Sequence, residues 1–192
     1  MSLFHTGNPY HKGDNMMIVY KPLTTEEIKI DLFAHFYRRQ KVTECYRFID
    51  GIWQIKECPF IDDWTMEEYQ ELTSCLQHTL KTNGYVLGAF LDKQLKGFVS
   101  VESSFFGENR DYLDLSSLHV SNDMRQQGIG KKLFCFAKNW AKKHGAKKLY
   151  ISSHSAVETQ SFYQAMGCVD AMEINEMHVI SEPFDRQLEC LL

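Results

Sequence analysis

Residues 113–132 read LDLSSLHVSNDMRQQGIGKK, and this stretch decides the fold. Its apolar first half is typical of a strand, which runs directly into a turn with two glycines, Gly128 and Gly130, and then into a helix. Glycine lets the backbone turn tightly and approach a ligand without a Cβ clash. The first N–H groups of a helix lack partners inside it and favour an anion, as does the helix dipole. The stretch therefore predicts a phosphate-binding turn.

The charge of the residues that follow this turn also indicates an anionic ligand. The whole chain carries a formal net charge of −4, yet residues 125–148 hold no acidic residue. The basic residues of this segment are Arg125, Lys131, Lys132, Lys138, Lys142, Lys143, Lys147 and Lys148. A basic segment in an acidic protein favours one anionic ligand. It could instead follow the phosphates of a nucleic acid, but the net negative charge and the lack of a recognition-helix motif disfavour that reading. We therefore expect no nucleic-acid partner.

The elements around the turn follow from capping boxes, turn residues and hydrophobic periodicity. Thr24 with Glu27 and Thr65 with Glu68 have the spacing that opens a helix. In the helix after the turn, an apolar stripe is expected at Ile129, Leu133, Phe136 and Trp140. The expected strands are 17–20, 85–91, 95–103, 111–120, 148–152, 168–174 and 187–192, and the expected helices are 24–38, 65–82, 130–144 and one ending near 166. The segment between the first two helices shows no clear pattern.

This order of elements indicates the fold class. Residues 85–120 predict an antiparallel meander, whereas the later part alternates helices and strands, which indicates parallel pairing. We expect a mixed α/β (α+β) fold with a central sheet of about six to seven strands, partly antiparallel and partly parallel, flanked by about four helices. The length of 192 residues and an apolar content of 44% suit one core. Residues 1–15 are expected to form a flexible tail and residues 16–192 a single domain.

The glycine turn carries a resemblance to a known family. Residues 125–130, Arg-Gln-Gln-Gly-Ile-Gly, resemble the acetyl-CoA signature of the GNAT superfamily of N-acetyltransferases, Arg/Gln-x-x-Gly-x-Gly/Ala, which follows the fourth strand. Residues 118–120 resemble its pantetheine-binding strand segment, and SFYQAMGC at 161–168 resembles its Phe-Tyr-x-x-x-Gly-Phe segment. The resemblance implies a GNAT fold with acetyl-CoA as co-substrate, bound by Leu118, His119, Val120, Arg125, Gln126, Gln127, Gly128, Ile129, Gly130, Lys131 and Lys132.

The resemblance also implies a reaction, in which a primary amine attacks the thioester directly in a ternary complex. Tyr163 stands at the position of the family's tyrosine, whose hydroxyl can protonate the departing thiolate as a general acid. A backbone N–H near His119 or Val120 is expected to polarise the thioester carbonyl. The general base stays open between Asp114 and Glu102, and each could equally be a solvated residue on a half-buried strand. His119 is a further alternative because imidazole has a suitable pKa.

The acceptor side is read from residues 48–64, where aromatic and acidic residues interleave. Such a mixture can hold a cationic amine by charge and cation–π contact. The candidate residues are Trp53, Asp62, Asp63 and Trp64, and the acceptor would be a small polyamine, an amino sugar or a lysine-like or peptide amine. The competing interpretation is a surface loop with core aromatics.

The remaining features are expectations about class. The six cysteines form no Cys-x-x-Cys pair and are read as reduced, and the histidines show no metal-ligand spacing, so no metal is expected. No signal peptide or bilayer-spanning segment is recognised, which predicts a cytoplasmic protein without a membrane partner, either a monomer or a homodimer. The alternative function is a catalytically inactive acyl-CoA-binding sensor or interaction domain.

Overall fold

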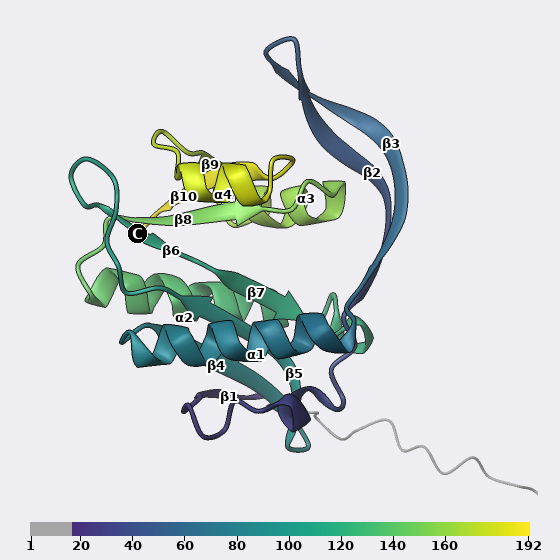
Figure 1. Ribbon diagram of the computed structural model, residues 1–192, viewed down its shortest axis with the longest axis vertical. Coiled ribbons are helices and arrows are strands. Elements are labelled where there is room, and N and C mark those ends of the chain that lie inside the picture. Colours follow the sequence, from purple (N-terminus) through teal and green to yellow (C-terminus); the bar gives the residue numbers. More distant parts are fainter. Residues whose placement is uncertain (1–16) are drawn as a thin grey trace, which may run out of the picture.

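The computed structural model describes residues 17–192, so the tail expected at residues 1–15 lies outside the described residues. This part of the chain holds α1 (Met66–Lys81), α2 (Ile129–Lys143), α3 (Val157–Ala165) and α4 (Glu176–Ser181). Its strands are β1 (Val19–Pro22), β2 (Arg39–Ile49), β3 (Ile52–Asp63), β4 (Tyr85–Leu91), β5 (Gln94–Val101), β6 (Tyr112–Asp114), β7 (Ser117–Val120), β8 (Lys148–Ser153), β9 (Val169–Asp170) and β10 (Arg186–Leu191) (Figure 1).

The strands form two four-stranded sheets and a separate hairpin. One sheet has the order β1-β4-β5-β7 and is antiparallel throughout, as the sequence predicts for the meander. The other has the order β6-β8-β10-β9, in which β6 and β8 are parallel and the remaining pairs antiparallel. The mixed α/β fold is therefore confirmed, but the sheet that the sequence predicts as one is split into two.

The split lies within the strand expected at 111–120. Its first half, β6, pairs with β8, and the backbone N–H of Leu115 donates the last bond to Tyr150, at 2.9 Å. Its second half, β7, pairs with β5 instead. The Ser116 hydroxyl at the break is held by Ser100 and Glu102, each at 2.8 Å. Because the chain leaves β8 at this point, the two sheets diverge, and within residues 17–192 the outer edge of β7 has no neighbouring strand.

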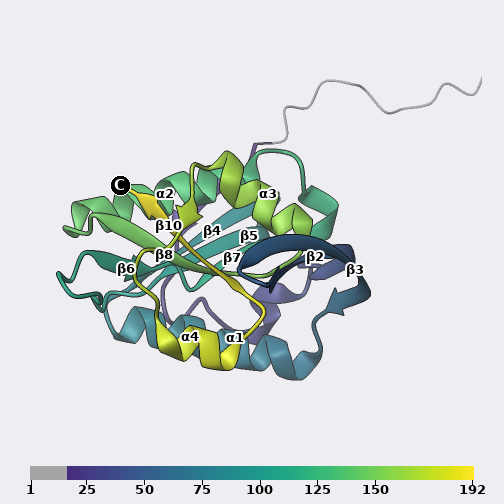
Figure 2. The same cartoon turned by 90° about the horizontal axis from the view of Figure 1, so that it is seen from above.

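Helices cover both sides of the sheets, with α2 and α3 on one side and α1 and α4 on the other (Figure 2). Helix α2 buries Ile129, Leu133, Ala137 and Ala141 along one face. The expected stripe is partly wrong, because Phe136 is 41% exposed. The small side chains of Ala137 and Ala141 allow the helix to lie close to the sheet, so α2 packs through this face rather than through the one that carries Phe136.

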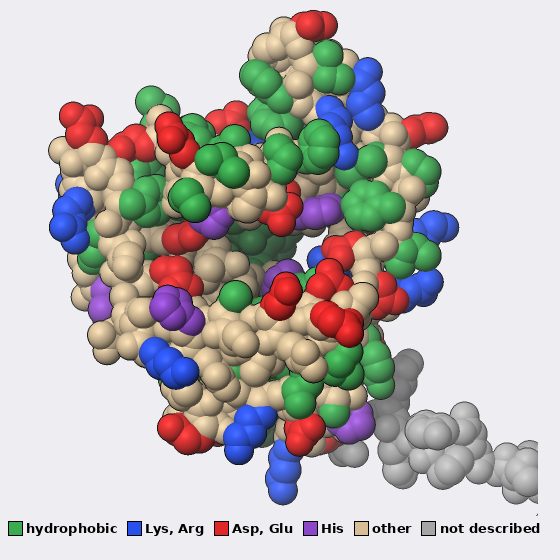
Figure 3. Space-filling view, in the orientation of Figure 1, with side chains coloured by type: hydrophobic (Ala, Val, Ile, Leu, Met, Phe, Trp, Pro, Cys, Tyr) green, Lys and Arg blue, Asp and Glu red, His purple; other side chains and the backbone are tan. Residues whose placement is uncertain are grey.

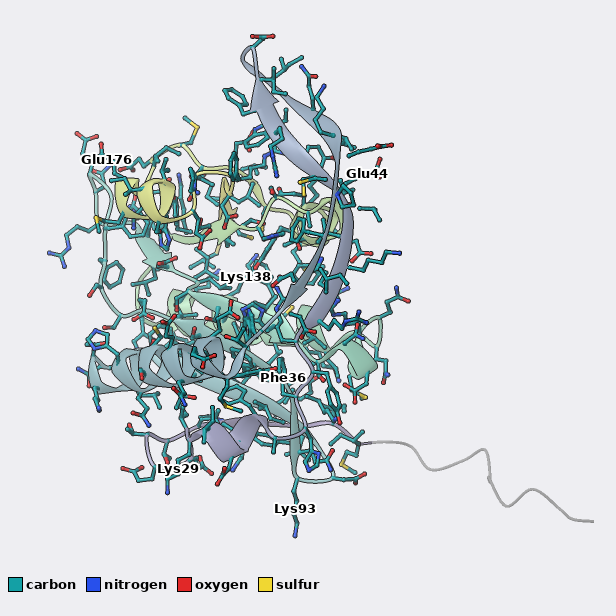
Figure 4. All side chains as sticks on the ribbon, turned by 45° about the vertical axis from the view of Figure 1, so that its right-hand side comes forward. Lys29, Phe36, Glu44, Lys93, Lys138 and Glu176 are labelled. Carbon is teal, nitrogen blue, oxygen red and sulfur yellow. The ribbon has the colours of Figure 1, made fainter. Side chains whose placement is uncertain are left out.

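The largest departure from the sequence prediction is the hairpin of β2 and β3, which projects from the body beside α3 (Figure 1). It docks at the loop before α3, where the backbone N–H of Tyr46 donates to the carbonyl of Ser155 at 2.8 Å. The Arg47 guanidinium also donates to the Ser155 hydroxyl at 2.7 Å. Glu44 lies on the outer side of the hairpin (Figure 4). The hairpin thus adds a wall beside the two sheets.

Two predicted elements are wrong. The helix expected at 24–38 is a turn followed by a 3-10 helix, Ile30–Phe33, although the Thr24 N–H does bond to the Glu27 carboxylate at 3.0 Å. Packing overrides this cap, because Phe33 and Phe36 point into a core cluster with Phe98. The strand expected at 168–174 is only β9, and the chain after it turns into α4.

The second capping box is confirmed and gives a first testable prediction. Glu68 N–H donates to the Thr65 hydroxyl at 3.3 Å, and Thr65 N–H donates to the Glu68 carboxylate at 2.7 Å. Thr65→Ala should lower the free energy of unfolding by about 1 kcal/mol, because one helix N–H loses its acceptor. Chemical denaturation measures this. Thr24→Ala is the matched control, since Thr24 precedes no α-helix, and an equal loss in both variants would contradict the prediction.

Candidate active site

A cavity of about 1250 Å³ opens where the two sheets diverge. Its lining comes from β7, the turn before α2, the loop after β8, α3, the base of the β2–β3 hairpin and residues 178–185. The space-filling view shows this hollow, bordered by acidic and histidine side chains (Figure 3). Segments far apart in the sequence thus meet around one space that is large enough for an extended cofactor and a second substrate.

Strand β7 presents its backbone to this cavity. The residues Ser117 to Val120 all line it. Arg125 Nε lies 3.5 Å from the carbonyl oxygen of Val120, so this carbonyl points off the sheet rather than toward β5. The N–H and C=O of a strand residue lie on the same side, so the Val120 N–H points outward as well. Sequence reasoning left the polarising N–H between His119 and Val120, and this geometry favours Val120.

The start of α2 forms the second wall. Gly128 is the N-cap, with φ of 77°, a left-handed conformation that favours glycine, and among residues 17–192 no side chain caps the helix. The first N–H groups of α2 are therefore free of a side-chain acceptor, and no acidic residue lies in the first turn. The expected cofactor residues that line the cavity here are Arg125, Gln126, Gly128, Ile129, Gly130 and Lys131.

Two expected cofactor residues lie elsewhere. Gln127 is not among the lining residues, and its amide contacts the Met124 sulfur at 3.7 Å. Lys132 is also outside the lining and lies over the Tyr20 ring, 5.5 Å from its centre. Gln127 precedes the helix, whereas Lys132 points away because consecutive residues at a helix start point in different directions and only some face the cavity.

Tyr163 lies on α3 and faces the cavity. It is 5% exposed and packs beside the rings of Phe134 and Phe162, at 6.0 Å and 5.1 Å. Within residues 17–192 its hydroxyl has no hydrogen-bond partner. Burial raises the pKa of Tyr163, and the acidic groups nearby add to the rise. The side chain is therefore a neutral phenol whose proton is available to a ligand in the cavity.

The two carboxylates considered as the base have different surroundings. Glu102 is absent from the cavity lining and accepts hydrogen bonds from the hydroxyls of Thr79 and Ser116, at 2.6 Å and 2.8 Å. Asp114 does not line the cavity either, but its Oδ2 lies 2.6 Å from Nε2 of His178, which does. Glu102 thus stabilises the break between β6 and β7, whereas Asp114 is connected to the cavity by its hydrogen bond with His178.

His119 lines the cavity among aromatic rings. Its imidazole meets the ring of Trp64 edge-on at 4.7 Å and lies 5.3 Å from that of Phe98. Burial lowers the pKa of His119 to about 3, and the positive charges of Arg38 and Arg125 contribute. This imidazole is neutral at physiological pH and takes up a proton only with difficulty, which disfavours it as a general base.

Three of the four expected acceptor residues line the cavity. Asp62, Asp63 and Trp64, at the base of the hairpin, line the cavity, and Asp62 forms an ion pair with Arg38. Trp53 does not line it and lies near the hairpin tip, with the Arg186 guanidinium 5.0 Å from its ring centre. The tryptophan at 53 is thus a packing contact of the hairpin.

Sequence reasoning missed several lining residues: Arg38, His154, His178, Glu182 and Asp185. Asp185 is half-buried, and burial raises its pKa to about 6, helped by the nearby charge of Glu182. One signal for the hairpin residues was present, since Asp50-Gly51 between apolar residues is a strong hairpin turn. No comparable signal exists for residues 178–185, because α4 spans only six residues.

The described residues also limit other site types. Within residues 17–192, no group of three or more His, Cys, Asp or Glu side chains is placed to hold a metal ion. In the same part of the chain, no helix has the length and apolar character needed to cross a membrane.

Comparison with known proteins bears on the activity. The model of the acetyltransferase (GNAT) family matches residues 49–168. No curated protein sequence matches the chain. Among solved structures, nourseothricin acetyltransferase is 14% identical with a TM-score of 0.63, over 90% of this chain and 95% of that one.

Two further structures have bound cofactors. A Bacillus anthracis str. Ames protein assigned as a streptothricin acetyltransferase, in complex with acetyl coenzyme A, is 17% identical with a TM-score of 0.64, over 91% of this chain and 96% of that one. The PaiA N-acetyltransferase of Thermoplasma acidophilum, in complex with coenzyme A, is 17% identical with a TM-score of 0.58, over 92% of this chain and 100% of that one. At these identities the likeness concerns the fold.

Proposed function

Because the chain belongs to the acetyltransferase (GNAT) family, we propose that it transfers an acetyl group from acetyl-CoA to a primary amine by direct attack within a ternary complex. The observation that carries the proposal is the meeting of three elements around one cavity: the outward edge of β7, the uncapped start of α2 and the phenol of Tyr163. We further propose that residues 16–192 form the single catalytic domain.

The cofactor would lie along β7 with its pyrophosphate at the start of α2. The N–H groups at the helix start and the charges of Arg125 and Lys131 attract the phosphates. The free edge of β7 offers backbone groups to the amides of the pantetheine arm, as a strand partner would. Residues of β7 and α3 would then hold the thioester end of the cofactor.

The chemistry then needs one electrophilic contact and one acid. The Val120 N–H, which points off the sheet, donates to the thioester oxygen as negative charge develops there. The Tyr163 hydroxyl, which has no partner within residues 17–192, protonates the departing thiolate. Both groups are held by packed elements, so they need little reorganisation during the reaction.

The acceptor would enter on the side of α1 and α4, where acidic side chains border the hollow (Figure 3). Glu182 and Asp185 supply negative charge near α4, whereas Arg125 and Lys131 supply positive charge at the start of α2, and the charges of Asp62 and Arg38 are paired with each other. This separation of charge favours a cationic acceptor. We propose a polyamine, an amino sugar or a lysine-like or peptide amine.

Calorimetry with acetyl-CoA and desulfo-CoA, together with thiol release over spermidine, glucosamine and Nα-blocked lysine, tests the proposal. We expect both cofactors to bind and at least one amine to be acetylated. Mass spectrometry identifies the acetylated product. Absence of cofactor binding would overturn the proposed function. Binding without turnover on any amine would instead support an acyl-CoA-binding sensor.

A further inference from the structure

We infer that His178 is the general base of this site and that Asp114 positions it. The inference rests on the proposed acetyl transfer and names a residue for the step that Tyr163 cannot perform. His178 lines the cavity from α4, and its Nε2 lies 2.6 Å from Asp114 Oδ2. Neither Asp114 nor Glu102 reaches the cavity lining by itself. The histidine is therefore the group that connects a buried carboxylate to the substrate space.

The pairing fixes the tautomer that a base requires. Within residues 17–192 Asp114 Oδ1 is buried without a hydrogen-bond partner, so the contact with His178 is the one that this side chain makes. In a neutral imidazole bonded to a carboxylate, Nε2 carries the proton and donates it. Nδ1 of His178, which has no partner in the same part of the chain, then keeps its lone pair for the proton of the amine.

Short helix α4 holds this imidazole in place although it spans only six residues. The Asn175 side chain caps it by accepting from the Met177 N–H at 3.1 Å. The Asn175 N–H in turn donates to the Tyr150 hydroxyl at 3.0 Å, which ties the cap to β8. Glu176, the first residue of α4, points outward (Figure 4), whereas His178 faces the cavity. The position of the base is thus set by contacts that leave its second nitrogen free.

The charges around His178 increase its affinity for a proton. The hydrogen bond with Asp114 raises the pKa of His178, against the opposing effect of burial, and Asp185 adds to the rise. The groups that face it are Asp114 from β6, Asp185 and Glu182 from the segment after α4, and Tyr150 from β8, whose ring centre is 5.7 Å away. His119, by contrast, has its pKa lowered by burial and by the charges of Arg38 and Arg125, so it is neutral. Burial also lowers the pKa of His154, the third histidine of the lining, so among these histidines the surroundings of His178 are those of a base.

The proton balance uses both ends of the site. The cationic amine first releases one proton to solvent; the neutral amine nitrogen then forms a bond to the acetyl carbon, and the carbon–sulfur bond breaks with its electron pair leaving on sulfur. His178 Nδ1 takes the proton that the nitrogen loses, and the Tyr163 hydroxyl gives its proton to the thiolate. The Tyr163 phenolate then regains a proton from His178 through solvent. One acetyl-CoA and one amine give one amide and one free thiol, and no other reactant is needed.

His178→Gln tests the inference, because glutamine can still donate to Asp114 but cannot take up a proton. We expect kcat for the acceptor that wild type acetylates to fall about 10²–10⁴-fold, with desulfo-CoA binding unchanged. His144→Gln is the matched control, since His144 is an exposed residue at the C-terminal end of α2 and outside the cavity. Wild-type turnover in His178→Gln would overturn the inference and leave the proposed function standing, whereas absence of cofactor binding in wild type would overturn both.

Asp114→Asn separates a positioning role from a structural one. Since Asp114 raises the pKa of His178, its removal lowers that pKa. A base must be deprotonated, so the acid limb of the kcat–pH profile should move to lower pH, and the plateau should fall because the weaker base accepts a proton less readily. A reduced plateau with an unmoved acid limb would mean that Asp114 only supports the fold, and would overturn its positioning role.

Discussion

Tyr163→Phe is expected to lower kcat about 10²–10⁴-fold, which corresponds to about 3–5 kcal/mol of transition-state stabilisation. The substitution removes one oxygen, and that oxygen has no hydrogen-bond partner within residues 17–192. The ring stays packed against Phe134 and Phe162, so the fold and the cofactor site should be intact. The loss arises because the thiolate must then leave without a proton from the enzyme. Steady-state thiol release and calorimetry with desulfo-CoA measure the two effects separately.

Tyr85→Phe is the matched control for this experiment. Tyr85 is a half-buried tyrosine, stacked on Trp140 with ring centres 5.4 Å apart, but it lies outside the cavity lining. We expect its kcat to equal that of wild type. If Tyr163→Phe also kept wild-type kcat, the thiolate would have to take its proton from another donor, and the acid role of Tyr163 would be disproved. A loss of cofactor affinity in Tyr163→Phe would show that the hydroxyl acts in binding.

The part of the site that could be predicted is local in sequence. The strand, glycine turn and helix at 113–132 stand together along the chain, so the residues that form the turn also form the wall of the cavity. The box of Thr65 and Glu68 is similarly complete within four residues, and it caps α1 as expected. Short-range signals of this kind are reliable when no distant packing competes with them.

The part that could not be predicted depends on distant contacts. Thr24 and Glu27 make the first hydrogen bond of a capping box, yet Phe33 and Phe36 are drawn into the core around Phe98 and the α-helix does not form. The pair of Asp114 and His178 joins residues that lie 64 positions apart, through a helix of one and a half turns that carries almost no sequence signal. The base is therefore identified from the fold rather than from a motif.

The hairpin of β2 and β3 shows why an exposed element is hard to recognise. Along β2 the buried positions alternate at Gln40 and Val42, but a register shift between Val42 and Glu44 breaks the pattern. Because much of the hairpin projects from the body, apolar residues such as Phe48 and Ile52 remain more than half exposed. Alternation reflects burial on one face, so it fades where there is no core to face. The turn at Asp50-Gly51 was the remaining signal.

Gly128→Val is expected to weaken desulfo-CoA binding about 10–100-fold and to lower the free energy of unfolding by about 1–3 kcal/mol. Gly128 has a φ of 77°, which a β-branched residue adopts only with strain, although an added Cβ would meet no atom within 4 Å. The strain therefore acts on the backbone rather than on neighbouring side chains. It displaces the first N–H groups of α2, and with them the donors proposed for the pyrophosphate. Calorimetry measures the affinity, and chemical denaturation measures the stability.

Gly145→Val separates the effect on binding from the effect on stability, because Gly145 follows the C-terminal end of α2 and also has a positive φ. Gly145 has a φ of 91°, also with nothing within 4 Å of an added Cβ, and it lies outside the cavity lining. Its valine variant should lose similar stability and keep wild-type affinity for desulfo-CoA. Equal weakening of binding in both variants would mean that general loosening of α2 is responsible, and the cradle at Gly128 would be disproved. Weakening confined to Gly128→Val would place the phosphate contact at the start of the helix, where the free N–H groups and the charges of Arg125 and Lys131 converge.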